Sequence, residues 1–176
     1  LFINIDSLSV KRASFEFYSH IQDHSPELSI RKADLDLYHF LLDSVTHQDK
    51  SRIFFSKNIE LTLNDFSLQL RDGIHSINAL KIYFSTRKSL IEISESIIRP
   101  DKAKNMIRNT NQYNTMLFFL PRLTFTGIDL KRVFNDRILD FNRLEIKEPE
   151  IKYTRFHLSE NKDPRFKKPE DFFEEE

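Results

Sequence analysis

The chain has 176 residues, and its 27 basic and 27 acidic side chains cancel to a formal net charge of zero. This length suits one sizeable domain better than two. The charge balance disfavours a nucleic-acid partner, because neutralising phosphates requires a net basic surface or stripe. Cysteine is absent, which excludes disulfides, thiolate metal sites and cysteine nucleophiles and leaves the redox compartment open.

The sequence predicts no membrane span and no signal peptide within these residues. It contains no run of roughly 18 consecutive apolar residues, and it begins at Leu1 without methionine or a charged start followed by an apolar run. This start suggests a processed or excised chain, so an anchoring or targeting segment upstream is compatible with it.

The composition favours strands joined by turns that use little glycine. Phenylalanine occurs 17 times, whereas glycine occurs only at Gly73 and Gly127. Connections are therefore expected to use Asn, Asp, Ser and Pro, and Asp72-Gly73 is the strongest hairpin signal.

Apolar residues recur along the chain at spacings of two, three and two. Four full copies of this rhythm are Ile3, Ile5, Leu8 and Val10; Leu61, Leu63, Phe66 and Leu68; Leu123, Phe125, Ile128 and Leu130; and Leu139, Phe141, Leu144 and Ile146. A helix would place apolar residues at spacings of three and four, so the rhythm favours strands.

The three-residue step interrupts the alternation of a strand. It would carry Phe66 to the face opposite Leu63 unless an extra residue bulges out. A similar interruption is expected between Ile77 and Leu80, followed by Ile82 and Phe84. We interpret the step as a bulge or bend that keeps the apolar residues on one face while curving a long strand.

In chain order, strands are expected near 2–18, 28–42, 52–71, 74–85, 89–98, 115–131 and 137–153. The segment 89–98 also suits an amphipathic helix, although strand is favoured. Residues 99–114 are expected to form a loop that is partly helical. The domain organisation is then a repetitive β-sheet domain over 1–153 and an irregular or disordered tail over 154–176.

Few residues suggest chemistry. His20 and His24 lie four apart in a turn-like stretch and are interpreted as solvated, with a hydrolase site there as a weaker alternative. Asp34 and Asp36 would share a strand face, which Leu35 and Leu37 mark as the solvent side. Glycine-rich phosphate loops, serine elbows and zinc-ligand spacings are absent from the sequence. We therefore expect no enzyme, catalytic residue, metal or cofactor.

The predicted fold class is all-β, with long, bulged, mainly antiparallel strands that form a curved sheet, an open groove or a sandwich. Such strands have one apolar face, which needs a cover. The cover would be a second sheet of this chain, another chain or an apolar ligand. The candidate groove-lining residues are Leu61, Leu63, Phe66, Leu68, Leu70, Ile82, Phe84, Leu123, Phe125, Ile128, Leu130, Phe141, Leu144 and Ile146.

The same apolar rhythm resembles a known family. The segments "LTFTGIDLKRVF" and "LDFNRLEIKEPEIKY", the later "NKDPRFKKP" and the strand "SLIEISESIIRPDK" that closes on Pro100 resemble the AsmA and TamB-like bacterial envelope proteins, in particular the repetitive AsmA-like proteins of the Bacteroidota. The family's strand pattern is matched by Leu139, Phe141, Leu144, Ile146, Pro149 and Ile151. The resemblance covers most of residues 1–153 and consists of a rhythm with few invariant side chains.

This resemblance implies a periplasmic protein held at the inner membrane by a helix that these residues do not contain. It also implies an elongated, groove-bearing sheet associated with phospholipid movement or outer-membrane homeostasis. The expected partners are phospholipid or another acyl-chain lipid, and other envelope proteins. The chain departs from the large members in its short length and missing anchor. The alternative expectation is a structural or protein-interaction module whose apolar residues form a closed core.

Overall fold

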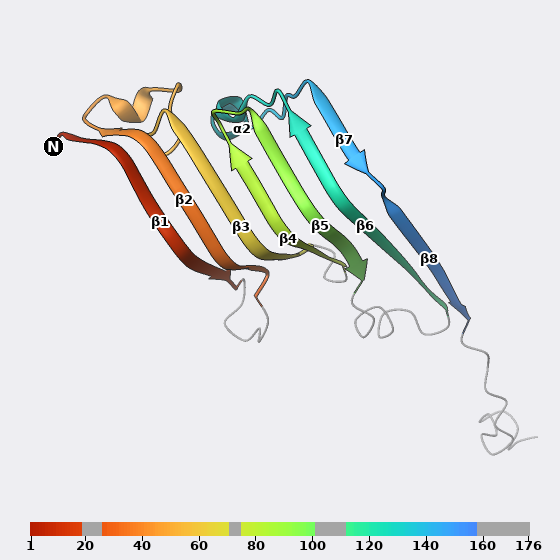
Figure 1. Cartoon of the computed structure of the whole chain (residues 1–176). Helices are drawn as coiled ribbons and strands as arrows, with labels where there is room; N and C mark the ends of the chain where they lie inside the picture. Colours follow the sequence, from red (N-terminus) through yellow and green to blue (C-terminus); the bar gives the residue numbers. More distant parts are fainter. Residues whose placement is uncertain (19–25, 71–74, 101–111, 158–176) are drawn as a thin grey trace, which may run out of the picture.

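A computed structural model describes residues 1–18, 26–70, 75–100 and 112–157. They form one open antiparallel sheet with the order β1-β2-β3-β4-β5-β6-β7, in which β8 also pairs with β6 (Figure 1). The strands are β1 Ile3–Phe17, β2 Leu28–Leu42, β3 Asn58–Gln69, β4 His75–Ser85, β5 Leu90–Pro100, β6 Gln112–Thr126, β7 Arg143–Lys147 and β8 Glu150–His157. The expected all-β class and antiparallel pairing are confirmed.

The last two strands are the halves of one interrupted strand. Leu123 on β6 faces Ile146 on β7, and Phe118 on β6 faces Ile151 on β8. The register is identical in both pairings, so the chain keeps its alignment across the break at Glu148. The sheet is therefore a meander in which every strand contacts its neighbours in sequence.

A line of bends crosses the sheet where the apolar spacing lengthens to three. From β2 to the junction of β7 and β8, pairing is interrupted at one aligned position in each strand. We call this position the central bend line; it comprises Arg31, Asp65, Leu80, Glu95, Pro121 and Glu148. The register is the same on both sides of it, so most strands bend without a two-against-one bulge.

Left-handed backbone accounts for the bends. Asp65, Glu95 and Glu148 have φ of 52°, 49° and 48°, whereas their neighbours across the strands are absent from the positive-φ set. One left-handed residue on every second strand thus suffices to turn the chain and to keep apolar residues on one face. Pro121 fits a central strand here because the ladder needs no N–H donor on this line.

The bulge expected from the sequence occurs only between β1 and β2. Pairing there shifts between Val10 and Ala13 and again between Ala13 and Phe15, and Arg12 has a φ of 57°. Elsewhere the step is a bend, the second of the two expected alternatives, and it is aligned across the strands. Because each strand from β2 onward contributes one residue to the bend line, the ladder keeps its alignment across the bend.

The position of the bend in β4 corrects the expected apolar set. Ile77 and Ala79 face Leu68 and Phe66 on β3, and the next paired apolar residue is Ile82. The long step therefore follows Ala79, and Leu80 lies on the central bend line with 48% of its surface exposed. Spacing alone predicts Leu80 in the apolar set, but the cross-strand register instead places the smaller Ala79 opposite Phe66 of β3.

Four expected strand bounds are also wrong. Residues 43–57 form a connection that contains the 3₁₀ helix η1 Thr46–Gln48, so β3 begins at Asn58 rather than near 52. The chain leaves the sheet after Thr126 and forms the helix α2 Leu130–Asp136, and no strand spans residues 137–142. The segment at 90–100 is strand, so its helical alternative is wrong. β8 continues beyond Tyr153 to His157, and the Asp72-Gly73 turn lies outside the described residues.

The buried core lies at one end of the sheet rather than along it. Leu37, Ile53, Ile59, Ile128 and Leu130 form the buried cluster, with Ile59 and Ile128 each only 1% exposed. Ile53 comes from the connection before β3, and Leu130 comes from α2. These two segments are the only described ones that lie over the sheet, at the same end (Figure 1).

Substitution at the bend should separate backbone strain from side-chain contact. Asp65→Val is expected to lower the free energy of unfolding by about 1 to 2 kcal/mol, because a β-branched residue resists left-handed backbone. Asp65→Gly should change it by less than about 0.5 kcal/mol, since the lost ion pair to Arg31 at 3.6 Å is exposed. Urea unfolding monitored by circular dichroism measures both variants.

Thr62→Val provides the matched control, because Thr62 lies on the same strand without left-handed backbone. Its unfolding free energy should stay the same or rise slightly. Equal losses in Thr62→Val and Asp65→Val would contradict the bend interpretation.

Candidate apolar binding surface

Cross-strand pairing aligns the apolar residues in rows that run across the sheet. Directly paired residues lie on the same face of a sheet, so each row shares one face. One row is Leu35, Leu61, Phe84, Ile91, Phe125 and Leu144; the next is Ala33, Leu63, Ile82, Ile93, Leu123 and Ile146. Beyond the central bend line the rows continue as Ile30, Phe66, Ala79, Ser96 and Leu120, then Leu28, Leu68, Ile77, Ile98, Phe118 and Ile151.

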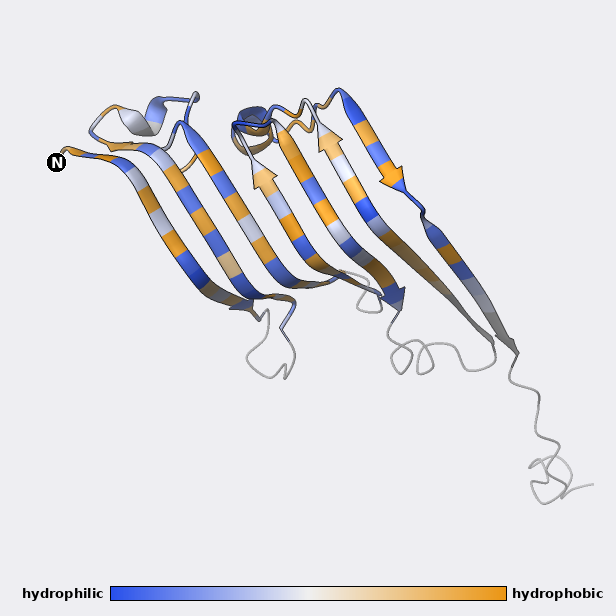
Figure 2. Cartoon of the chain, in the orientation of Figure 1, coloured by the Kyte–Doolittle hydropathy of each residue, from blue (hydrophilic) through white to orange (hydrophobic). Residues whose placement is uncertain are grey.

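We define these four rows as the apolar face. Figure 2 shows the corresponding apolar bands alternating with polar bands along the strands. Between the rows lie paired polar positions such as Asp36 with Glu60 and Asn64 with Lys81. The two faces are therefore chemically distinct across β2, β3 and β4, whereas on β5 and β6 the opposite face also carries Ile97, Leu117 and Phe119.

Most of the apolar face is only partly buried. Apart from Ala79 and Ser96, no residue in the four rows is buried, and Leu144, Ile146 and Ile151 at their β7–β8 ends are exposed. Phe15 on β1 is 50% exposed, and Ile151 on β8 is 66% exposed. Among the described residues, no second layer covers the rows away from the buried end.

The buried end is closed by two segments that meet over it. We call the connection 43–57 together with α2 the cap. Phe134 on α2 contacts Phe54 of the connection and Phe84 of β4, with ring centroids 5.5 Å and 5.9 Å apart. Asn135 donates a hydrogen bond of 2.8 Å to the carbonyl of Lys50, and Lys50 lies 3.5 Å from Asp136. The cap thus joins the β2–β3 side of the sheet to the β4–β6 side.

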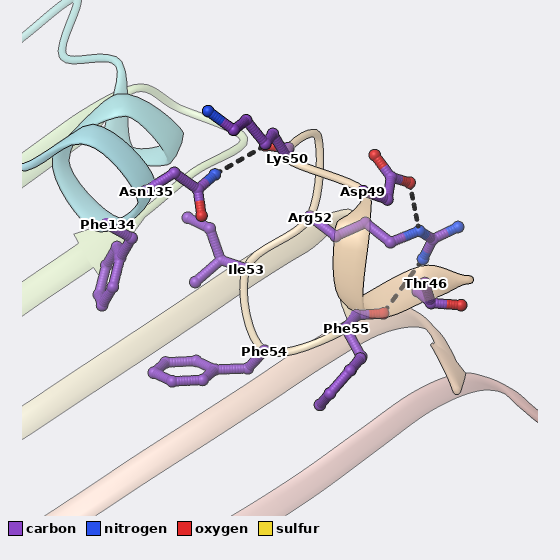
Figure 3. Close-up of a pocket in the computed structure, with 9 residues that line it drawn as sticks. All are labelled: Thr46, Asp49, Lys50, Arg52, Ile53, Phe54, Phe55, Phe134 and Asn135. Atoms are coloured by element: carbon purple, nitrogen blue, oxygen red, sulfur yellow. Dashed lines mark hydrogen bonds and ion pairs between the residues drawn. The ribbon is translucent and has the colours of Figure 1, made fainter. Parts of the chain in front are cut away.

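A small open pocket of about 360 Å³ lies within the cap (Figure 3). Its lining includes Thr46, Asp49, Lys50, Arg52, Ile53, Phe54, Phe55, Phe134 and Asn135. Arg52 contacts Asp49 at 3.1 Å and donates to the carbonyl oxygens of His39 and Phe55 at 2.7 and 3.1 Å. Lys50 and Arg52 of the pocket each already contact an acidic side chain. The pocket is therefore better explained as part of the packing between α2 and the connection than as an anion site.

Carboxylates hold the connection in its folded form. Asp43 accepts hydrogen bonds from the Thr46 hydroxyl and from the N–H groups of Val45 and Thr46, which lower the pKa of its carboxyl. Contacts with Ser51 and then Arg52 likewise lower the pKa of Asp49. Left-handed backbone at Phe54 and Phe55, with φ of 48° and 63°, completes the turn into β3.

The helix α2 begins and ends at residues suited to those roles. Asp129 accepts hydrogen bonds from the N–H groups of Lys131 and Arg132, and Arg137 ends the helix with a φ of 57°. Gly127 precedes it with a φ of 68°, and an added Cβ there would lie 2.3 Å from the Asn142 amide nitrogen. The chain can therefore leave β6 at this point only with glycine.

Asp34 and Asp36 on the polar face contact β1. Asp36 accepts hydrogen bonds from Lys11 at 2.7 Å and from Ser9 at 2.5 Å, which lower the pKa of Asp36. Asp34 accepts a 2.8 Å hydrogen bond from the Arg12 backbone N–H. Both carboxylates attach β1 to β2 on the solvent side, where the sequence placed them.

The structure places the predicted lining residues in three settings. Leu61, Leu63, Phe66, Leu68, Ile82, Phe84, Leu123, Phe125, Leu144 and Ile146 lie in the rows of the apolar face. Ile128 and Leu130 are buried in the cluster beneath the cap, and Phe141 packs against it, 5.2 Å from Phe125. Leu70 follows β3 and donates to the His75 carbonyl at 2.8 Å.

Sequence reasoning missed the cap residues Ile53, Phe54 and Phe134. The signal for α2 was present, because Asp129 is a good N-cap and Leu130, Val133 and Phe134 follow at helical spacing. The competing strand rhythm at Ile128 and Leu130 obscured it. No comparable signal marks Ile53, since its burial depends on α2 meeting the connection across the sheet.

Some of the remaining expectations concern residues outside the described ranges, and the others concern residues within those ranges. His20 and His24 lie outside them. Within the described ranges, no group of three or more His, Cys, Asp or Glu side chains is arranged to hold a metal ion. The described helices are too short or too polar to cross a membrane.

Comparison with known proteins gives no match: no family model, curated protein or solved structure is similar to this chain at a significant level.

Acid should loosen the cap before the sheet. The pKa of Asp43 is lowered in the folded chain, so its stabilising effect is present above the unfolded pKa of about 3.9 and is lost as pH falls through the folded pKa. Hydrogen exchange of residues 45–56, compared between about pH 6 and pH 3 after correction for intrinsic rates, should show early loss of protection there.

Asp43→Asn should reduce protection of the same segment already at neutral pH and flatten its pH dependence. Glu150→Gln on the distant strand β8 is the matched control and should behave as the unmodified chain. Uniform loss of protection over the whole sheet would contradict a local role for Asp43.

Proposed function

We propose that this chain is a non-enzymatic lipid-binding or lipid-transport segment of an AsmA-like cell-envelope protein. The observation that supports the proposal is the apolar face, which crosses the whole sheet and is covered by described residues only at the cap. Large contiguous apolar patches are rarely exposed on soluble monomers, and where they occur they mark binding or interaction sites. Acyl chains of phospholipids fit this surface chemically.

The mechanism of the proposal is passive. Acyl chains would lie against Leu61, Leu63 and Phe66, and each buried CH₂ group would contribute about 0.8 kcal/mol. Headgroups would remain in solvent, so the sheet needs no specific polar contact to hold the chain of a lipid. Movement along such a surface requires no chemical step.

The proposed location is the periplasm, with the full-length protein anchored in the inner membrane. It rests on the resemblance of the apolar rhythm to AsmA-like and TamB-like proteins. Phospholipid or another acyl-chain lipid is the proposed ligand, and other envelope proteins are proposed partners.

A structural or protein-interaction module is the second candidate. It is favoured by the outer strands, because β1 and β8 carry exposed apolar residues at the ends of the rows. In that case the apolar face would be covered by another protein sheet to form a sandwich. The described residues themselves make one layer, so the second sheet would come from elsewhere.

A charge placed on the apolar face should separate the two candidates. Phe66→Asp is expected to weaken lipid binding by about tenfold or more, because a carboxylate in contact with acyl chains loses its hydration. The chain should stay folded, since Phe66 is only partly buried. Native mass spectrometry of chain purified from its host envelope, followed by lipid extraction, measures occupancy and identifies the lipid class.

Ser67→Asp is the matched control, because it adds the same charge one residue away, in the polar row that pairs with Ser29 and Asn78. It should retain lipid. A lipid-free mass for the unmodified chain, with a cooperative thermal transition, would contradict lipid binding and direct attention to protein partners.

A further inference from the structure

The outer edge of β1 is open among the described residues. β1 pairs only with β2, over 15 residues without a proline. Its apolar side chains remain accessible, with Val10 42% and Phe15 50% exposed. Natural sheets usually blunt such an edge with short strands, charges or proline, because unpaired N–H and C=O groups accept another strand.

The other outer edge is blunted in this way. The strand there is broken at Glu148, which has left-handed backbone, and Pro149 removes a hydrogen-bond donor. The longer, proline-free edge is therefore at β1, whose pairing with β2 shifts only between Val10 and Phe15.

The apolar pattern of β1 is symmetric about Ser9. Its apolar residues fall at equal distances on either side of this residue: Leu8 and Val10, Ile5 and Ala13, Ile3 and Phe15. All six lie on the same side of the sheet as the apolar face, since each pairs with an apolar residue of β2. A second β1 laid antiparallel with Ser9 opposite Ser9 would thus oppose apolar residues only to apolar residues.

We propose that the β1 edge binds a second copy of this chain in this register. The two copies would be related by a twofold axis perpendicular to the sheet at Ser9. Such an isologous contact closes after two copies, as most homodimers do. The two sheets would become one, with both apolar faces on the same side.

The charged residues of β1 fit the same register. Asp6 of one copy lies opposite Arg12 of the other, and the twofold axis repeats this pair. Both side chains are exposed and therefore available. Opposite charges in directly paired positions are favourable, and like charges there are unfavourable.

The bends of the two edges also match. In the sheet, each bend places a left-handed residue opposite one that is not left-handed, as Asp65 lies opposite Leu80 and His39 opposite Asp6. In the proposed pairing, Arg12 with its φ of 57° lies opposite Asp6, so the rule continues across the new edge. This inference does not depend on lipid binding, because it uses only the strand edge.

Charge reversal tests the contact. Sedimentation equilibrium of the full chain should show a monomer–dimer equilibrium. Asp6→Arg and Arg12→Asp should each raise the dimer dissociation constant by about tenfold or more, because each creates two like-charge pairs. The double variant Asp6→Arg with Arg12→Asp should return the constant to near its original value, and Lys152→Asp on β8 should leave it unchanged.

Cross-linking tests the register. The chain has no cysteine, so Ser9→Cys provides a single thiol. Directly opposite Cα atoms lie about 4.5 to 5.5 Å apart, within disulfide range, so oxidation should yield a covalent dimer. Ser14→Cys, on the same strand and also exposed, should not cross-link, because its two copies would lie roughly 33 Å apart.

Three outcomes would overturn the proposal. One is a monomer at all concentrations together with equal cross-linking of Ser9→Cys and Ser14→Cys. Another is a dimer weakened by Lys152→Asp but by neither β1 variant, which would assign the contact to the other edge. The third is failure of the double variant to restore a dimer that both single variants weaken.

Discussion

The structure depends on one backbone constraint. Each long strand must keep its apolar residues on one face although their spacing lengthens once from two residues to three. A strand alternates faces at every residue, so the step would bury polar groups on one side of the bend. Left-handed backbone at Asp65, Glu95 and Glu148 absorbs the extra residue. Because the bends align across the sheet, pairing resumes in the same register and the rows of the apolar face remain continuous.

The buried core of this single sheet lies at one end of its strands. A single layer can bury little, so the closed cluster forms only where the cap adds a second layer. Asp43 and Asp129 set the folded geometry of the two cap segments, and Phe134 joins them through ring contacts. The remaining apolar face has the chemistry of an interior and the exposure of a surface. This combination underlies the proposal of a lipid ligand and the alternative of a protein cover.

The sheet can also be extended at the β1 edge by a further strand. Rows that end in exposed apolar residues at a long, proline-free edge are suited to continuation by another strand. The apolar spacing of β1 is symmetric about Ser9, so an antiparallel copy of β1 would oppose apolar residues to apolar residues. Asp6 and Arg12 add a charge pattern that selects one register among several with similar apolar matches.

The sequence by itself determined the fold class, the antiparallel strands and most of the apolar face, because side-chain alternation is a local property that spacing reveals. It also placed Asp34 and Asp36 on the solvent side. Only the tertiary structure decided that Ala79 rather than Leu80 joins a row, because that depends on cross-strand register rather than hydropathy. The burial of Ile53, Ile128 and Leu130 was likewise decided there, since two segments distant in sequence must meet over the sheet before these residues leave water.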